Sequence, residues 1–217
     1  MAGRPAAGGG RRVEVDPERL ARWVASFADR HGPPEIGIEA YGVRLAAPDG
    51  AVAELFTPPG VPAAPDLPGF LAAATAARRL GLVLARQRAV AVGIAYGPDL
   101  VTSKVETSYV QGRTAAGGWS QQRFARRRAN QAKAAAGDAA DLVARLLLPA
   151  VDTLDAVVAG GDRRTVDAIL SDRRLVAVAA LRASRLLDVP EPRHAVLGAA
   201  VGAARAVHIV VRDPLNS

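Results

Sequence analysis

Residues 100–137 read LVTSKVETSYVQGRTAAGGWSQQRFARRRANQAKAAAG, and this stretch decides the fold. It begins as a strand, because Val, Thr and Tyr are frequent from Leu100 to Gln111. It then passes through a Gly-Gly turn into a helix that we expect to reach about Leu148. Helices and strands interleave along the rest of the chain. This order predicts an α/β (α+β) protein in which helices pack on a mixed β-sheet.

The remaining elements are predicted from turn residues and apolar periodicity. We expect helices over residues 16–31, 70–85, 162–170 and 192–204, a hairpin over 36–57, and strands over 88–96, 153–159 and 206–211. Residues 175–187 fit either a strand or a helix. Residues 1–12 are basic and rich in glycine, so we expect a disordered tail there. Residues 13–217 are expected to form a single domain with an N-terminal helix and hairpin extension.

Charge is the second informative property of the chain. The formal net charge is +7 and the isoelectric point is about 10.8, which favours a polyanionic partner. No acidic residue occurs from Thr107 through Gly137. The basic residues of this window are Arg113, Arg123, Arg126, Arg127, Arg128 and Lys133. Because they lack acidic partners four residues away, we interpret them as a cationic surface for phosphate, with RNA as the first candidate.

Several classes of function lack support in the sequence. The chain has no cysteine, which excludes disulfides and thiolate metal sites and fits a cytoplasmic protein. Its histidines, His31, His194 and His208, fall in different elements without a ligand pattern, so we expect no metal. No Rossmann or P-loop glycine pattern is present, so we expect no cofactor. No apolar run is long enough to cross a bilayer, so we expect no membrane partner.

The glycine turn carries the candidate chemistry. Gly117 and Gly118 remove side chains and permit positive φ, so the backbone can approach a crowded ligand. Gln121 follows with an uncharged donor and acceptor, which can orient a water or hydroxyl and bond an oxyanion. An amide is a poor general base, so the reaction would depend on positioning and electrostatics. Trp119 between them is suited to stacking on a base.

The helix after the turn is the candidate RNA-binding element. Arg123, Arg126, Arg127 and Asn130 fall partly along one flank of the helix, where they can contact successive phosphates. Alanines at 125, 129, 132 and 136 recur on the other side and are expected to pack on the sheet. The alternative interpretation of the arginine run is a solvated helix face.

These residues resemble a known family. Gly117-Gly118-x-x-Gln121-x-Arg123-Phe124-Ala125-Arg126 is similar to the catalytic loop and following helix of eukaryotic and archaeal class I peptide-release factors, in which a Gly-Gly-Gln tip precedes Arg-Phe-Ala-Arg. Trp119 and Ser120 separate the glycines from the glutamine here. That spacing resembles the Gly-x-x-Gln variant of Vms-type release-factor-like proteins, and the whole chain resembles their actinobacterial branch. The likeness is best over residues 100–170.

The resemblance implies a release-factor middle-domain fold and catalysis at the 3′ end of tRNA. It makes Gln121 the catalytic glutamine, Gly117 and Gly118 the flexible turn, and Arg123 with Arg126, Arg127 and Arg128 the RNA-gripping helix. Gln122 offers a second amide, so either glutamine can be the active one. The implied partners are peptidyl-tRNA and the RNA of the large ribosomal subunit, for a protein we expect to be a monomer.

Two reactions fit this family. One is hydrolysis of the peptidyl ester, and the other is cleavage of the tRNA acceptor end, with Arg123 or Arg126 stabilising a phosphorane. The chain is too short to add the codon-reading domain of a termination factor, so we expect a peptidyl-tRNA hydrolase or tRNA endonuclease that frees nascent chains from stalled large subunits without reading a codon. The alternative is a non-catalytic RNA- or ribosome-binding module.

Overall fold

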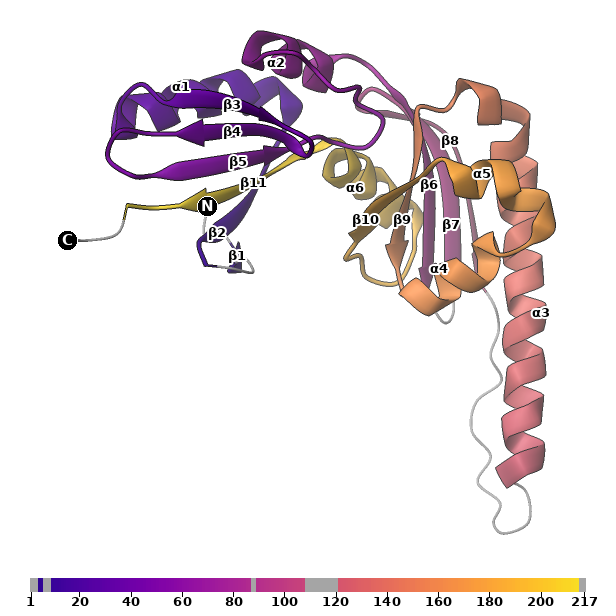
Figure 1. Cartoon of the computed structure of the whole chain (residues 1–217). Coiled ribbons are helices and arrows are strands. Elements are labelled where there is room, and N and C mark those ends of the chain that lie inside the picture. The colour runs from indigo at the N-terminus through magenta and orange to yellow at the C-terminus, as the bar shows by residue number, and fades with distance from the viewer. Residues whose placement is uncertain (1–3, 6–8, 87–88, 108–120, 215–217) are drawn as a thin grey trace. The chain divides into compact units, whose positions relative to one another are not determined.

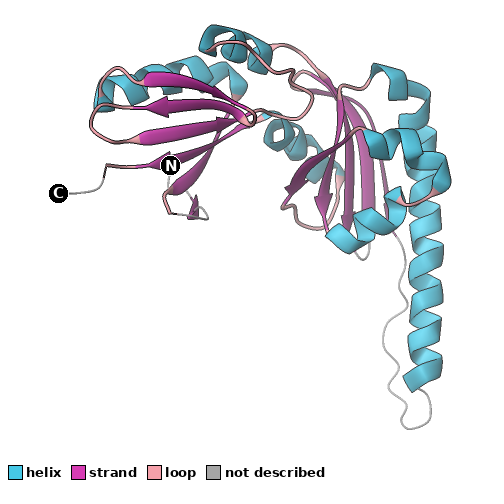
Figure 2. Cartoon of the chain, viewed as in Figure 1, coloured by secondary structure: helices cyan, strands magenta, loops and turns pink. Residues whose placement is uncertain are grey.

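The protein is represented by a computed structural model that describes residues 4–5, 9–86, 89–107 and 121–214, with the backbone alone for residues 121–133. It contains two compact units, Met1–Arg78 with Gly202–Ser217, and Arg79–Val201. Each unit combines a β-sheet with helices (Figures 1 and 2). This division differs from the single domain expected over residues 13–217, because the C-terminal strand pairs with strands near the N-terminus and leaves the middle of the chain to build its own unit.

The first unit is built on an antiparallel sheet. Its described strands follow the order β1-β2-β11-β5-β4-β3. They are β1 (Arg4–Pro5), β2 (Arg11–Val15), β3 (Glu35–Glu39), β4 (Gly42–Ala46), β5 (Val52–Phe56) and β11 (Val207–Arg212). Arg4 and Pro5 pair with Arg12 and Arg11, so part of the segment expected to be a disordered tail forms strands instead. Pairing with β11 on its other side satisfies the backbone groups of β2, which composition alone does not reveal.

The core of the first unit lies on one face of this sheet. Along β4, Val43 and Leu45 are buried in that core, whereas Arg44 between them points to the other face. The helices of this unit are η1 (Pro17–Arg19), α1 (Leu20–His31) and α2 (Leu67–Thr75). Phe27 of α1 and Phe70 of α2 are fully buried in the same core. The predicted N-terminal helix and the hairpin of β4 and β5 are therefore confirmed.

The hairpin turn is tied to the end of α1. Asp49 Oδ1 accepts a hydrogen bond from the Ala51 amide at 2.9 Å, and Asp49 Oδ2 lies 2.8 Å from His31 Nδ1. The Ala51 amide is the larger cause, and His31 the next, of the lowered pKa of Asp49. His31 thus has a structural role.

The second unit is built on a mixed sheet. Its described strands follow the order β10-β9-β6-β7-β8, in which β10, β9 and β6 are parallel and β7 and β8 are added antiparallel. They are β6 (Arg79–Arg86), β7 (Ala89–Tyr96), β8 (Asp99–Thr107), β9 (Ala156–Gly161) and β10 (Arg182–Leu187). This sheet and its helices confirm the predicted α/β (α+β) class and the predicted strands at β7, β8 and β9.

Helices cover the sheet of the second unit. They are α3 (Gln121–Leu147), η2 (Leu148–Thr153), α4 (Arg163–Leu170), η3 (Arg173–Leu175), α5 (Val176–Ala180) and α6 (His194–Arg205). One face of the sheet packs against α3 and α4, as Val92 and Ile94 of β7 share a core with Val143 and Ile169. The segment 175–187, which fitted either a strand or a helix, contains both α5 and β10.

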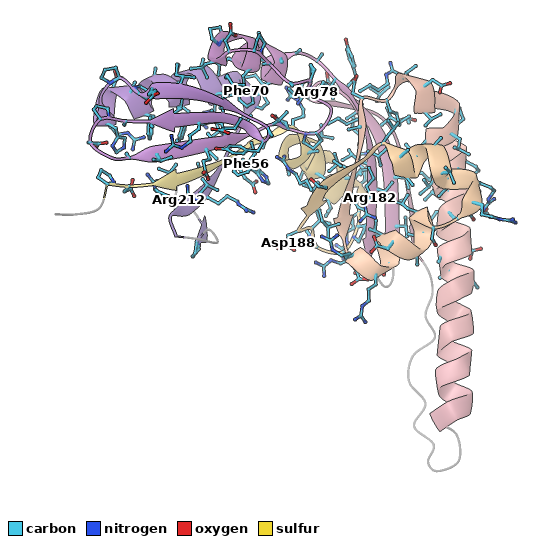
Figure 3. All side chains as sticks on the ribbon, in the orientation of Figure 1. Phe56, Phe70, Arg78, Arg182, Asp188 and Arg212 are labelled. Carbon is cyan, nitrogen blue, oxygen red and sulfur yellow. The ribbon has the colours of Figure 1, made fainter. Side chains whose placement is uncertain are left out.

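The helix expected over residues 70–85 is correct only in its first part. α2 ends at Thr75, and residues 79–86 form β6, the central strand of the second sheet. Both faces of β6 are covered, so Leu80 to Ala85 are all buried and show no alternation. Arg78 ends α2 by donating from Nη1 to the carbonyls of Ala73, Ala74 and Ala76 (Figure 3).

Candidate functional site

The predicted site lies where β8 is joined to α3. Residues 108–120 between them lie outside the described residues. α3 is a continuous helix of 27 residues, which corresponds to about 40 Å. Figure 1 shows its N-terminal turns extending well beyond the ends of strands β6, β7 and β9. We call residues 121–136 of α3 the arm and residues 138–147 the anchored part.

Among the described side chains of α3, full burial begins at Ala139. Ala139, Ala140, Leu142, Val143 and Leu147 of the anchored part are all buried in the core of the second unit. Nearer the N-terminus, Ala134, Gly137 and Asp138 are exposed, and residues 135–136 are half-buried. The arm is thus carried by a helix whose last ten residues are held by the sheet.

Two ion pairs hold the anchored part from different neighbours. Arg145 Nη2 donates to Glu106 Oε1 of β8 at 2.8 Å, and Arg174 Nη1 of η3 lies 2.7 Å from Asp141 Oδ1. Arg174 also bonds Asp172, with Nη2 2.7 Å from Oδ2. Each exposed pair contributes little to stability by itself, but together they restrict how the helix can rotate. The sequence analysis did not identify these residues, because the partners are far apart in the chain and no local pattern joins them.

The ion pair of Asp172 with Arg174 makes stability depend on pH. Hydrogen bonds from the Arg174 side chain, then from its backbone amide, lower the pKa of Asp172 from 3.8 to about 2. A folded-state pKa below the unfolded value stabilises the fold above pH 3.8, and the contribution is lost as the pH falls towards 2. We expect Asp172→Asn to lower the melting temperature at neutral pH, with a difference from wild type that shrinks as the pH approaches 2. A constant difference across this range, measured by circular dichroism melts, would contradict this cause.

Charge is segregated along α3. The arm contains the basic residues Arg123, Arg126, Arg127, Arg128 and Lys133 and no acidic residue. The first acidic residue of the helix is Asp138, immediately after Gly137, and Asp141 already has a cationic partner. The positive charge is therefore concentrated in the arm, on the N-terminal side of the anchored part.

Because α3 is one continuous helix, the faces of the arm and of the anchored part can be compared by helical periodicity. At about 100° per residue, positions 123, 126, 127 and 130 share one face of the helix. The buried positions Ala139 and Val143 fall on the opposite face at the same period. The expected RNA-binding stripe is thus in phase with the solvent side of the anchored part, and the alanine positions of the arm are in phase with its buried side.

The predicted site residues are described unequally. Arg113, Gly117, Gly118 and Trp119 lie outside the described residues, as does the expected helix cap, Ser120. The others lie in the arm, with only their backbone described: Gln121, Gln122, Arg123, Arg126, Arg127, Arg128, Asn130 and Lys133. The catalytic and RNA-binding roles assigned to these residues stay predictions.

A second glycine-containing turn, between β9 and α4, has a structural explanation. Gly161 has a φ of 93°, and a Cβ there would lie 2.2 Å from the Ala85 carbonyl oxygen. Asp162 caps α4 by accepting from the Thr165 amide at 2.8 Å and from its hydroxyl at 2.7 Å. The Asp162 carboxylate thus occupies the helix N-terminus that an anion would use.

The described residues show neither a metal cluster nor a membrane span. No group of three or more His, Asp or Glu among them could hold a metal ion. His194 begins α6, and His208 Nε2 lies 3.5 Å from Glu14 Oε1 within the first unit. Among the described helices, none combines the length and apolar character needed to cross a bilayer.

The second unit is thus an α/β body with a mixed sheet that holds the C-terminal part of a long helix, and the N-terminal part of that helix carries basic residues. The chain belongs to the Actinobacteria/chloroflexi VLRF1 release factor family, whose model matches residues 78–210, more than half of the chain. The matched region includes all of residues 100–137. The description of this family is that of a release factor.

Two solved structures are similar to the chain. One is an archaeal protein with 17% identity and a TM-score of 0.38, and the match covers 72% of this chain and 48% of the archaeal chain. The other is the crystal structure of an archaeal translation termination factor, aRF1, with 14% identity and a TM-score of 0.40. The match covers 85% of this chain and 61% of the aRF1 chain. The chain thus spans less than two thirds of the length of either structure. Comparison with curated proteins gives no significant match.

Proposed function

We propose that the protein is a ribosome-associated peptidyl-tRNA hydrolase that frees nascent chains from stalled large ribosomal subunits. Gln121 positions the attacking group, Gly117 and Gly118 allow the loop to approach the tRNA 3′ end, and the arginines of the arm bind RNA phosphates. The protein acts in the cytoplasm as a monomer, and it recognises peptidyl-tRNA on the large subunit without reading a codon.

One observation carries this proposal. A single helix begins at Gln121, carries positive charge without any acidic residue up to Gly137, and is held in the core by residues from Ala139 onward. Such a helix presents its N-terminus, where the glutamine lies, away from the body that holds its C-terminus. Peptidyl-tRNA on a large subunit is surrounded by RNA phosphates, which a cationic arm without acidic residues complements.

The chemistry follows from what an amide can do. In ester hydrolysis, water attacks the carbonyl carbon of the peptidyl ester, the bond to the ribose oxygen breaks, and a proton passes to that oxygen. Gln121 supports this reaction by orienting the water and donating to the oxyanion. In acceptor-end cleavage, a ribose 2′-hydroxyl attacks the adjacent phosphorus instead, and Arg123 or Arg126 stabilises the phosphorane. The bond from phosphorus to the 5′-oxygen of the next nucleotide then breaks, a proton passes to that oxygen, and a 2′,3′-cyclic phosphate is left on the shortened tRNA.

The two reactions leave different tRNA products, which makes the proposal testable. Stalled large subunits that carry peptidyl-tRNA labelled in both the peptide and the tRNA would be incubated with the purified protein. Ester hydrolysis releases a free peptide and a full-length tRNA, whereas acceptor-end cleavage releases a peptide that still carries nucleotides and a shortened tRNA. Binding to the subunits without either product would establish the alternative, a non-catalytic ribosome-binding module.

A further inference from the structure

β3 is an edge strand of the first sheet (Figure 1). Among the described strands it pairs only with β4, so about half of its backbone N–H and C=O groups point away from the sheet. Pro33 and Pro34 precede the strand, and a turn at Ala40 and Tyr41 follows it, so the open edge is limited to Glu35–Glu39. An open edge of this kind can accept one further extended strand.

The apolar side chains of β3 are only partly covered. Ile36 lies opposite Leu45 and Ile38 opposite Val43, so all four side chains share the face of the sheet that carries the core. Leu45 and Val43 are buried, whereas Ile36 is 48% and Ile38 is 44% exposed. A strand added beside β3 would bury both isoleucines against its own apolar side chains, which would have to occupy alternate positions.

The opposite face of β3 is acidic. Glu35, Gly37 and Glu39 alternate with the isoleucines, and both glutamates are exposed. Within the described part of the chain, neither glutamate forms an ion pair or a side-chain hydrogen bond. An added strand would therefore meet two carboxylates, four residues apart, that have no cationic partner among those described residues.

A second copy of this chain fits this edge poorly. Antiparallel pairing of two β3 strands about Gly37 would place Ile36 opposite Ile38 of the second copy, but it would also place Glu35 opposite Glu39 at both ends. Like charges directly opposite one another destabilise a pair of strands. The glutamates thus disfavour self-association and favour a partner of opposite charge.

We propose that the free edge of β3 binds an extended, basic segment of a partner protein, which joins the sheet as an antiparallel strand. Two apolar side chains of the segment pack on Ile36 and Ile38. A Lys or Arg on each side of them lies opposite Glu35 or Glu39, which gives the pattern basic-apolar-any-apolar-basic. The edge belongs to the first unit, whereas the residues of the candidate site belong to the second, so the inference does not depend on the proposed function.

Two synthetic peptides test this surface. The basic probe TTKVTVKTT has the required pattern, and the acidic probe TTEVTVETT differs only in its charges. Each would be titrated into the isotopically labelled 217-residue chain, with amide chemical shifts followed by nuclear magnetic resonance. We expect the basic probe to shift the amides of residues 35–39 and to bind about ten-fold more tightly than the acidic probe, because two attractive cross-strand pairs replace two repulsive ones. Equal affinities, no binding of the basic probe, or shifts that leave out β3 would overturn the proposal.

A charge swap separates strand pairing from general attraction. The double variant Glu35→Lys with Glu39→Lys should reverse the preference, so that the acidic probe binds about ten-fold more tightly than the basic one. The control is Asp16→Lys with Asp29→Lys, which changes the net charge equally at two exposed positions outside β3. This control is expected to keep the wild-type preference for the basic probe. Reversal in both double variants, or in neither, would overturn the proposal.

Discussion

Replacing Gln121 with alanine is expected to lower the rate of peptide release about 100-fold or more. The substitution removes the amide that orients the attacking group and donates to the oxyanion, and it leaves the cationic arm intact. Alanine is also a better helix former than glutamine, so the first turn of α3 is preserved. The measurement is single-turnover release at saturating protein, since the loss should fall on the chemical step and not on binding.

Gln122→Ala is the matched control for this prediction. The two residues are adjacent, have the same side chain and begin the same helix. If Gln121 is the active amide, Gln122→Ala releases peptide at close to the wild-type rate. The reverse result would assign the reaction to Gln122, and two variants as active as wild type would remove both glutamines from the mechanism.

Replacing Arg126, Arg127 and Arg128 together with alanine is expected to weaken binding to large subunits and tRNA alike. Each phosphate contact that is lost lowers the salt dependence of binding, so the slope of log affinity against log salt should fall by about 2 to 3. Such a change corresponds to about a hundred-fold loss of affinity or more at low salt. Titrations at several salt concentrations would measure both quantities.

A matched control for this prediction removes three positive charges from α4 and η3 instead of from the arm. Arg163, Arg164 and Arg173 are exposed on α4 and η3, and a triple alanine variant there removes the same three charges. If binding depends on the arm, this control keeps most of the affinity and the salt slope. An equal loss in the two triple variants would mean that net charge, and not the arm, attracts RNA.

Elements with a clear local signal could be predicted from the sequence. Apolar residues at helical spacing predicted α3, and runs rich in Val, Ala and Thr predicted β7 and β8. The turn at Asp49 predicted the hairpin of β4 and β5. β6 was missed in favour of a helix because a strand buried on both faces shows no alternation. The division into two units was missed because β11 pairs with β2 and β5, which lie at the other end of the chain.

The sequence predicted the charge pattern of the candidate site, but not the contacts that hold its helix on the sheet. The acid-free window identified the arm, and the helix observed there is continuous through it. The sequence did not indicate which contacts hold the C-terminal part of α3. These are the burial of Ala139 and the ion pairs with Glu106 and Arg174, whose partners on α3 lie more than thirty residues away in the chain.

The most direct test of the central claim is peptide release from isolated large ribosomal subunits that carry peptidyl-tRNA and no messenger RNA. Because such subunits present no codon, a protein that depends on decoding has nothing to read on them. We predict that the purified wild-type protein frees the peptide from these subunits, and that Gln121→Ala binds them equally well and frees almost none. Subunits that bind wild type and keep their peptides attached would contradict the account.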